Sequence, residues 1–167
     1  VTKAYAGMPD ASAEELLAML DGVTGTGETA FQKAELQTQL FTQQGNLAAA
    51  ANSVLKTNLT DDEKVQQVWQ WITSIPASSL DSVGSAYPDL SPFITLRELT
   101  EENASSPEKL VKSLQQFKQV YRGHVLENAL PENVIEATQI TDAGANDIAV
   151  LLPLSGRLAR TGQVVKN

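Results

Sequence analysis

Apolar residues recur at spacings of three and four over the first three quarters of the chain, a period typical of amphipathic α-helices. The clearest example follows Thr60-Asp61-Asp62-Glu63, which predicts a capping box at a helix start. Pro76 ends the pattern. The expected buried stripe consists of Val65, Val68, Trp69, Ile72 and Ile75.

Similar signals predict helices before and after this one. Ser12 and Glu15 form a second candidate capping box. Gly45-Asn46 is a candidate left-handed cap between two further helices. The remaining helices are expected over residues 29–44, 47–56, 93–102 and 106–121. The sequence therefore predicts a mainly α protein.

Two stretches lack a clear period. Residues 76–92 are rich in Pro, Ser and Gly, so we expect an irregular connection with one short helical turn. Residues 124–147 are expected to be a domain linker, with one short helix around 131–137.

The pattern changes again after residue 146. Residues 147–153 form a short apolar run typical of a buried parallel strand, and residues 158–167 resemble the opening of a helix. We therefore predict three parts, namely a helical domain (1–123), a linker (124–147), and the first strand and helix of a truncated α/β domain (148–167). An apolar edge strand seeks partners, so we expect this last part to dock on the helices or to pair with another copy.

Residues 31–59 resemble one tetratricopeptide-type (TPR-like) helix pair. The supporting residues are the Gly45-Asn46 turn and the small or apolar Ala50 and Val54 that follow it. Antiparallel helix pairs stacked into a superhelix are the predicted architecture, and an ordinary helical bundle is the alternative.

Composition excludes several classes of function. With 12 Lys and Arg against 20 Asp and Glu, the net charge of −8 argues against a nucleic-acid partner. The absence of cysteine excludes thiolate chemistry, and the single histidine excludes a multi-histidine metal site. The longest apolar run, 148–152, is too short to span a bilayer.

Residues that resemble catalytic or ligand-binding groups have simpler structural explanations. The glycines at 22, 25 and 27 lack a preceding strand and a following Lys-Ser or Lys-Thr, so we expect a loop rather than a phosphate site. His124 follows a helix-ending glycine, and the acidic pairs fit helix starts and solvated faces. We predict no enzymatic activity and no catalytic, metal-binding or cofactor-binding residue.

Binding surfaces remain as candidates. The helix over 106–121 and the residue after it carry cations, which suggest a face for an acidic partner; the alternative is a solvated face paired with nearby Glu residues. Trp71 lies off the apolar stripe and is either a packing residue or an exposed contact. The candidate partner-binding residues are Lys109, Lys112, Lys118, Arg122 and Trp71.

The segment 147–165 resembles the opening of the type I periplasmic-binding-protein fold. Together with the helices around Trp69, 93–102 and 106–121, it resembles the LpoA family of outer-membrane lipoproteins that activate class A penicillin-binding proteins. The resemblance implies a non-catalytic periplasmic regulator of peptidoglycan synthesis. In such a regulator the helices position a synthase-activating domain, and the anchor is a lipid absent from this sequence.

That resemblance implies a penicillin-binding protein as partner, with peptidoglycan as a second candidate, and no cofactor. Two other functions stay open at this point. One is a solute-binding or sensor protein of the periplasmic-binding-protein superfamily, and the other is a TPR adaptor that captures peptides.

Overall fold

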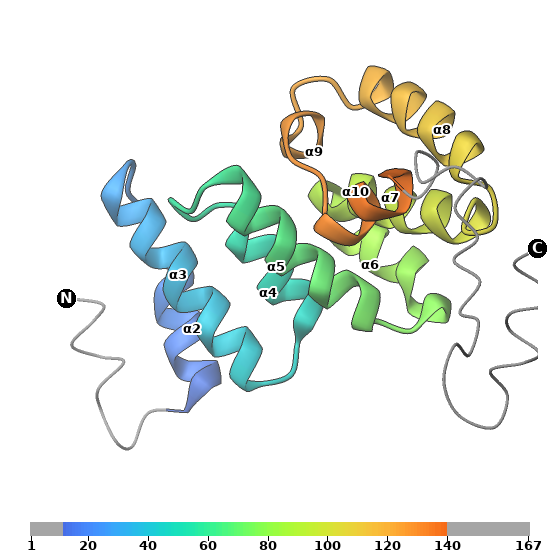
Figure 1. The fold of residues 1–167 in the computed structure, drawn as a ribbon. Helices are drawn as coiled ribbons and strands as arrows, with labels where there is room; N and C mark the ends of the chain where they lie inside the picture. The colour runs from blue at the N-terminus through green and yellow to red at the C-terminus, as the bar shows by residue number, and fades with distance from the viewer. Residues whose placement is uncertain (1–11, 140–167) are drawn as a thin grey trace, which may run out of the picture.

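The structure, a computed structural model, describes residues 12–139, and these form helices joined by short connections (Figure 1). No strand occurs in that range, which confirms the mainly α prediction. The predicted strand and helix of 148–167 lie outside the described residues. The helices are α2 (Ala13–Asp21), α3 (Glu28–Gln43), α4 (Leu47–Val54), α5 (Asp61–Ser74), α6 (Leu80–Ala86), α7 (Ser91–Glu102), α8 (Pro107–Val120), α9 (Val125–Asn128) and α10 (Glu132–Gln139), with 3₁₀ turns η1 (Ala77–Ser79) and η2 (Pro88–Leu90).

Both predicted capping boxes are present. The Glu15 N–H donates to Ser12 Oγ while Glu15 Oε2 accepts from the Ser12 N–H. Thr60 and Glu63 make the same reciprocal pair at the start of α5. The hydrogen bonds that the Glu63 carboxylate accepts from Thr60 lower the pKa of Glu63.

The α3–α4 connection confirms the predicted left-handed turn. Gly45 has φ +72°, and its N–H donates to the Thr42 carbonyl while the Asn46 N–H donates to the Phe41 carbonyl. This pattern is a Schellman motif, which allows α4 to reverse direction. The Asn46 side chain then accepts from the Ala49 N–H and caps α4. Alanines on α4 are buried, so this helix packs closely between α3 and α5.

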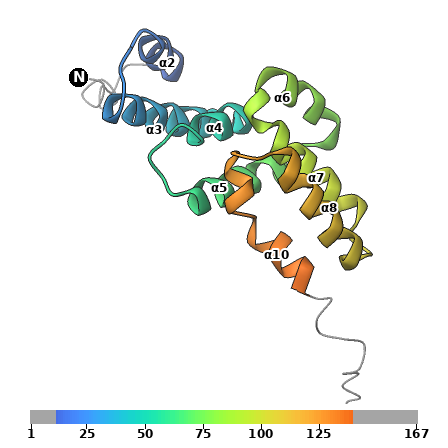
Figure 2. The same cartoon turned by 90° about the horizontal axis from the view of Figure 1, so that it is seen from above.

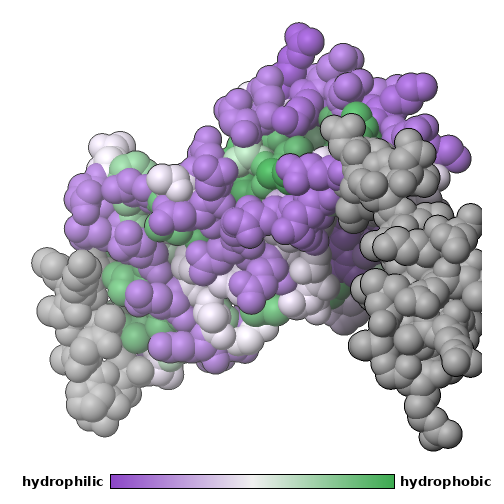
Figure 3. All heavy atoms as spheres, viewed as in Figure 1, coloured by the Kyte–Doolittle hydropathy of each residue, from purple (hydrophilic) through white to green (hydrophobic). Residues whose placement is uncertain are grey.

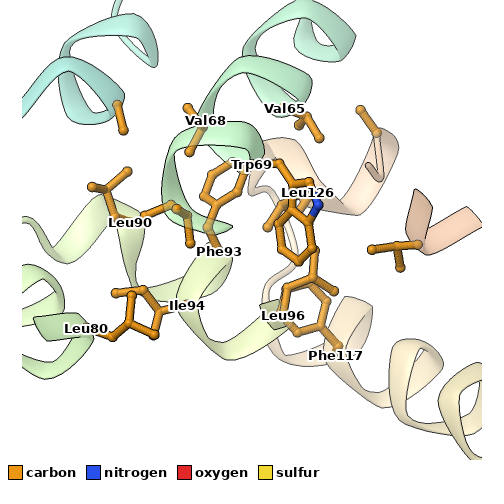
Figure 4. Close-up of a cluster of buried hydrophobic side chains, with 14 of the residues drawn as sticks. Val65, Val68, Trp69, Leu80, Leu90, Phe93, Ile94, Leu96, Phe117 and Leu126 are labelled. Atoms are coloured by element: carbon orange, nitrogen blue, oxygen red, sulfur yellow. The ribbon is translucent and has the colours of Figure 1, made fainter. Parts of the chain in front are cut away.

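The main hydrophobic core lies where α5, α7 and α8 meet, and α9 and α10 cover it (Figure 4). The predicted stripe of α5 is buried there, as are Leu110, Leu114 and Phe117 of α8. Trp69 is 6% exposed, and its indole N–H has no hydrogen-bond partner among the described residues. The largest completely buried side chains include Phe93, Ile72, Leu90, Leu96, Leu110 and Leu126.

Arg97 on α7 holds this helix against the end of α5. Its Nη1 donates to the carbonyl oxygens of Ile72 and Ile75, at 2.8 and 2.7 Å. Its Nε lies 2.7 Å from Glu101 Oε1. Because α5 has no basic residue in its own last turn, α7 supplies the cation that complements the negative end of that helix.

The expected irregular connection over 76–92 is corrected by the structure. It is almost entirely helical, as η1, α6 and η2 in succession. Leu80 and Leu90 are buried in the core and anchor it at both ends. Burial of these two leucines outweighs the weak local preference of the Pro-, Ser- and Gly-rich sequence.

The described part of the expected linker, residues 124–139, packs on the helical body. It forms α9 and α10, of which α10 overlaps the short helix expected around 131–137. Leu126 and Val134 are completely buried, and α10 lies against α8. Residues 140–147 lie outside the described part of the chain, so the domain boundaries stay a prediction.

Candidate interaction surfaces

The cations predicted as a binding face lie on and just after α8. Lys109, Lys112 and Arg122 are exposed and Lys118 is half-buried. Within residues 12–139 the only ion pair joins Arg97 and Glu101, so none of the α8 cations pairs with a described carboxylate. The expected pairing with nearby Glu residues is therefore absent from this part of the chain.

Helix geometry divides these cations into two groups. Lys109 and Lys112 are three positions apart and share one side of α8. Lys118 lies nine positions after Lys109, which at 3.6 residues per turn puts it on the opposite side. Arg122 follows beyond the C-cap residue Tyr121. A partner-binding role for these cations stays a prediction, and a single continuous face does not describe them.

Trp71 is half-buried on α5 and packs against the core cluster. It therefore has a packing role, and its remaining exposed area leaves a contact with a partner as a prediction. Figure 3 shows the hydropathy of one face of the molecule. Hydrophilic residues predominate there, and hydrophobic ones form small separate patches.

His124 is a helix-end residue, as the sequence suggested. Its Nδ1 accepts a hydrogen bond from the Leu126 N–H and caps α9, and its ring packs edge-on against Phe93, with 5.5 Å between ring centroids. Burial lowers the pKa of His124, and the backbone and charge of Asp89 oppose that shift only in part. The fold thus favours the neutral imidazole.

The loop with three glycines borders an open hollow of about 540 Å³ between α2, α3 and the end of α4. Lys33 Nζ donates to the carbonyl oxygens of Val23 and Asp21, at 3.1 and 3.4 Å. This lysine therefore provides hydrogen bonds to backbone carbonyl oxygens at the end of α2 and the start of the loop, in agreement with a structural role.

Two further hollows were not predicted from the sequence. One, of about 520 Å³, lies along α5 over Leu59, Asp62 and a row of glutamines. The other, of about 340 Å³, lies between α7 and α8. Its walls combine polar and apolar positions of the two helices, and no signal in either helix alone indicates that these positions meet.

Side chains that could hold a metal ion do not gather in the described range. Residues 12–139 contain no group of three or more His, Asp or Glu side chains placed to hold a metal ion. Among the same residues no helix has the length and apolar character needed to cross a membrane.

The described residues thus define a helical protein whose candidate sites are surfaces and grooves. The LppC putative lipoprotein family matches residues 12–167, and the chain belongs to this family. Its curated relatives are LpoA proteins, as the sequence resemblance predicted.

Relatives named penicillin-binding protein activator LpoA include those of Haemophilus ducreyi and Mannheimia succiniciproducens. The former is 23% identical over 71% of this chain and 21% of its own length, and the latter 23% identical over 80% and 24%. The Erwinia tasmaniensis relative is 26% identical over 62% of this chain and 16% of its own length. This chain thus spans a quarter or less of these relatives. No solved structure gives a significant match.

Proposed function

We propose that this chain is the helical arm of an envelope lipoprotein that activates a penicillin-binding protein by binding, without chemistry of its own. The observation that carries the proposal is the family match over residues 12–167, with relatives named as activators of a penicillin-binding protein. The arm extends from an outer-membrane lipid anchor and positions a second domain for a class A synthase in the periplasm.

The helices α2 to α10 support the positioning role. Helix α2 lies at one end of the body against α3, and α10 lies in the other half against α8, where the chain folds back so that the Glu132 N–H donates to Gln66 Oε1 on α5 (Figures 1 and 2). This arrangement keeps the start of the described chain, at α2, away from its end, at α10. The side-chain packing of α5, α7 and α8 holds this arrangement.

Activation by binding requires a difference in affinity. A regulator shifts the synthase toward its active state only to the extent that it binds that state more tightly. In this proposal the second domain makes that discriminating contact, and the helical arm sets its position.

The test compares two proteins against a purified class A penicillin-binding protein. One is this chain, and the other extends through the full length of the relatives. We expect the longer protein to bind and to stimulate peptidoglycan synthesis, and this chain alone to do neither. Failure of the longer protein to bind or stimulate contradicts the proposal.

A variant pair examines the α8 cations in the same assay. Lys109→Glu with Lys112→Glu reverses two exposed charges on one side of α8, and Lys56→Glu with Lys64→Glu makes the same charge change elsewhere. If the arm only positions the second domain, both longer-protein variants stimulate equally. A selective loss in the α8 variant would make α8 a direct contact and contradict the purely positioning role.

A further inference from the structure

The groove between α7 and α8 is built from matching faces of two antiparallel helices, which the views of Figures 1 and 2 both place side by side. On α7 the lining positions are 95, 98, 99 and 102, and on α8 they are 113, 116, 117 and 120. Each set follows the i, i+3, i+4, i+7 spacing of a single helix face. Two such faces give a straight groove about 10 Å long, at 1.5 Å per residue.

One end of the groove is apolar. Val120 is 73% exposed, more than any other large hydrophobic residue in the described range. It lies beside Tyr121, whose hydroxyl is 3.2 Å from Thr95 Oγ1, and the buried ring of Phe117 packs on Tyr121 with 4.7 Å between centroids. The hydrogen bond and the ring contact hold Tyr121 and Phe117 in place, and Val120 is exposed beside them. Burial of such an exposed apolar side chain by a partner contributes favourable binding free energy.

The α7 wall of the groove is acidic. Glu98 and Glu102 are exposed and lie one helical turn apart. None of the lining residues is basic, and neither carboxylate forms an ion pair within residues 12–139. Lys109, one turn before Ser113 on α8, is likewise not in ion-pair contact with them. The groove therefore offers two uncompensated negative charges beside an apolar end.

We propose that this groove docks a short extended segment of a partner protein that carries an apolar side chain followed within three residues by Lys or Arg. The apolar side chain covers Val120, and the cations lie along Glu98 and Glu102. The spacing follows from the groove length, because three residues of extended chain span about 10 Å. This inference goes beyond the proposed function, and its test uses no penicillin-binding protein, so the two can fail separately.

The experiment measures fluorescence anisotropy of labelled eight-residue peptides with the full 167-residue chain. The probe is Gly-Ser-Leu-Gly-Lys-Lys-Ser-Gly. One comparison peptide replaces both lysines by Glu, and another replaces Leu by Ser. We expect saturable binding of the probe that weakens as salt is added, and at least fivefold weaker binding of each comparison peptide.

Matched variants locate the site. Glu98→Gln with Glu102→Gln should weaken probe binding about fivefold and reduce its salt dependence. The control Glu132→Gln with Glu136→Gln changes the same charge on α10 and should leave affinity unchanged. Val120→Ser should also weaken binding about fivefold, and its control is Ile135→Ser on α10. Circular dichroism verifies that all four variants are folded.

Several outcomes overturn the proposal. These are absence of saturable binding, equal affinity for the Glu peptide, and an equal effect of the α10 controls. Sedimentation velocity adds a further one. If the chain dimerises through Val120 and the probe does not bind, a second copy occupies the groove instead of a partner segment.

Discussion

Replacement of Arg97 by alanine is expected to destabilise the junction of α5 and α7 more than any surface change in this part of the chain. The Arg97 side chain is 12% exposed, and its guanidinium donates to the carbonyl oxygens of Ile72 and Ile75. It thus supplies hydrogen bonds to carbonyl oxygens at the C-terminal end of α5, including that of Ile75, the residue before Pro76. Pro76 lacks an N–H, which removes one donor from this turn.

The magnitude follows from the partners that remain after the change. The Ile72 oxygen retains the Ile75 N–H at 3.3 Å, so loss of its second bond costs about 1 kcal/mol. The Ile75 oxygen loses its charged donor, and a group left unsatisfied costs about 2 kcal/mol. Glu101 is 61% exposed, so its ion pair contributes about 0.5 kcal/mol or less. Together these give about 3 kcal/mol, or a lowering of Tm by about 9 °C.

Urea denaturation followed by circular dichroism measures this loss, with the fluorescence of Trp69 and Trp71 as a second probe. Glu101→Gln is the control because it removes the ion pair and retains both bonds to the carbonyl oxygens. We expect this control to lie within about 0.5 kcal/mol of the unmodified protein. A loss below about 1 kcal/mol for Arg97→Ala, or an equal loss for Glu101→Gln, refutes the reasoning.

Three further predictions concern backbone conformation, capping and pH. Gly45→Ala should cost about 1 kcal/mol in denaturant unfolding because φ is +72°, whereas Gly22→Ala, at φ −73°, should not destabilise. Thr60→Ala should cost about 1 kcal/mol by the same measurement, and Thr60→Ser should restore most of it. Because the folded-state pKa of His124 lies below 6.5, its contribution to stability is complete above pH 6.5 and is lost as pH falls below that value. His124→Asn, which retains a capping oxygen, should therefore flatten the dependence of Tm on pH between 5 and 7; an unchanged slope contradicts this assignment.

The long helices were predictable because each carries its own apolar period and its own caps. The start of α5 shows this most clearly, since the reciprocal Thr60–Glu63 pair lies within four residues of sequence. Local hydrogen bonds of this kind need no tertiary information. The predicted bounds of these helices therefore differ from the observed ones by only a few residues.

The shorter elements depend on distant contacts. Leu80 and Leu90 are buried in the core cluster, where α6 packs on α7 and η2 packs on α4 and α7. Each belongs to an element too short to display a period. The same holds for Leu126 on α9 and Val134 on α10. Arg97 is a further case, because its carbonyl partners lie 25 and 22 residues earlier in the chain. A sequence pattern within one helix cannot indicate a hydrogen bond between two helices.

The candidate surfaces differ in the same way, because one can be derived from a single helix and the other depends on contacts between two helices. The separation of Lys109 from Lys118 follows from helix geometry alone, whereas the groove lined by Glu98 and Val120 exists only because α7 and α8 pack antiparallel. The exposed cations and the groove have opposite charge, so they select opposite partners. A partner held by Lys112 loses affinity when that lysine becomes Glu, whereas a basic segment in the groove does not. The charge of a binding segment therefore tells which of the two surfaces it uses.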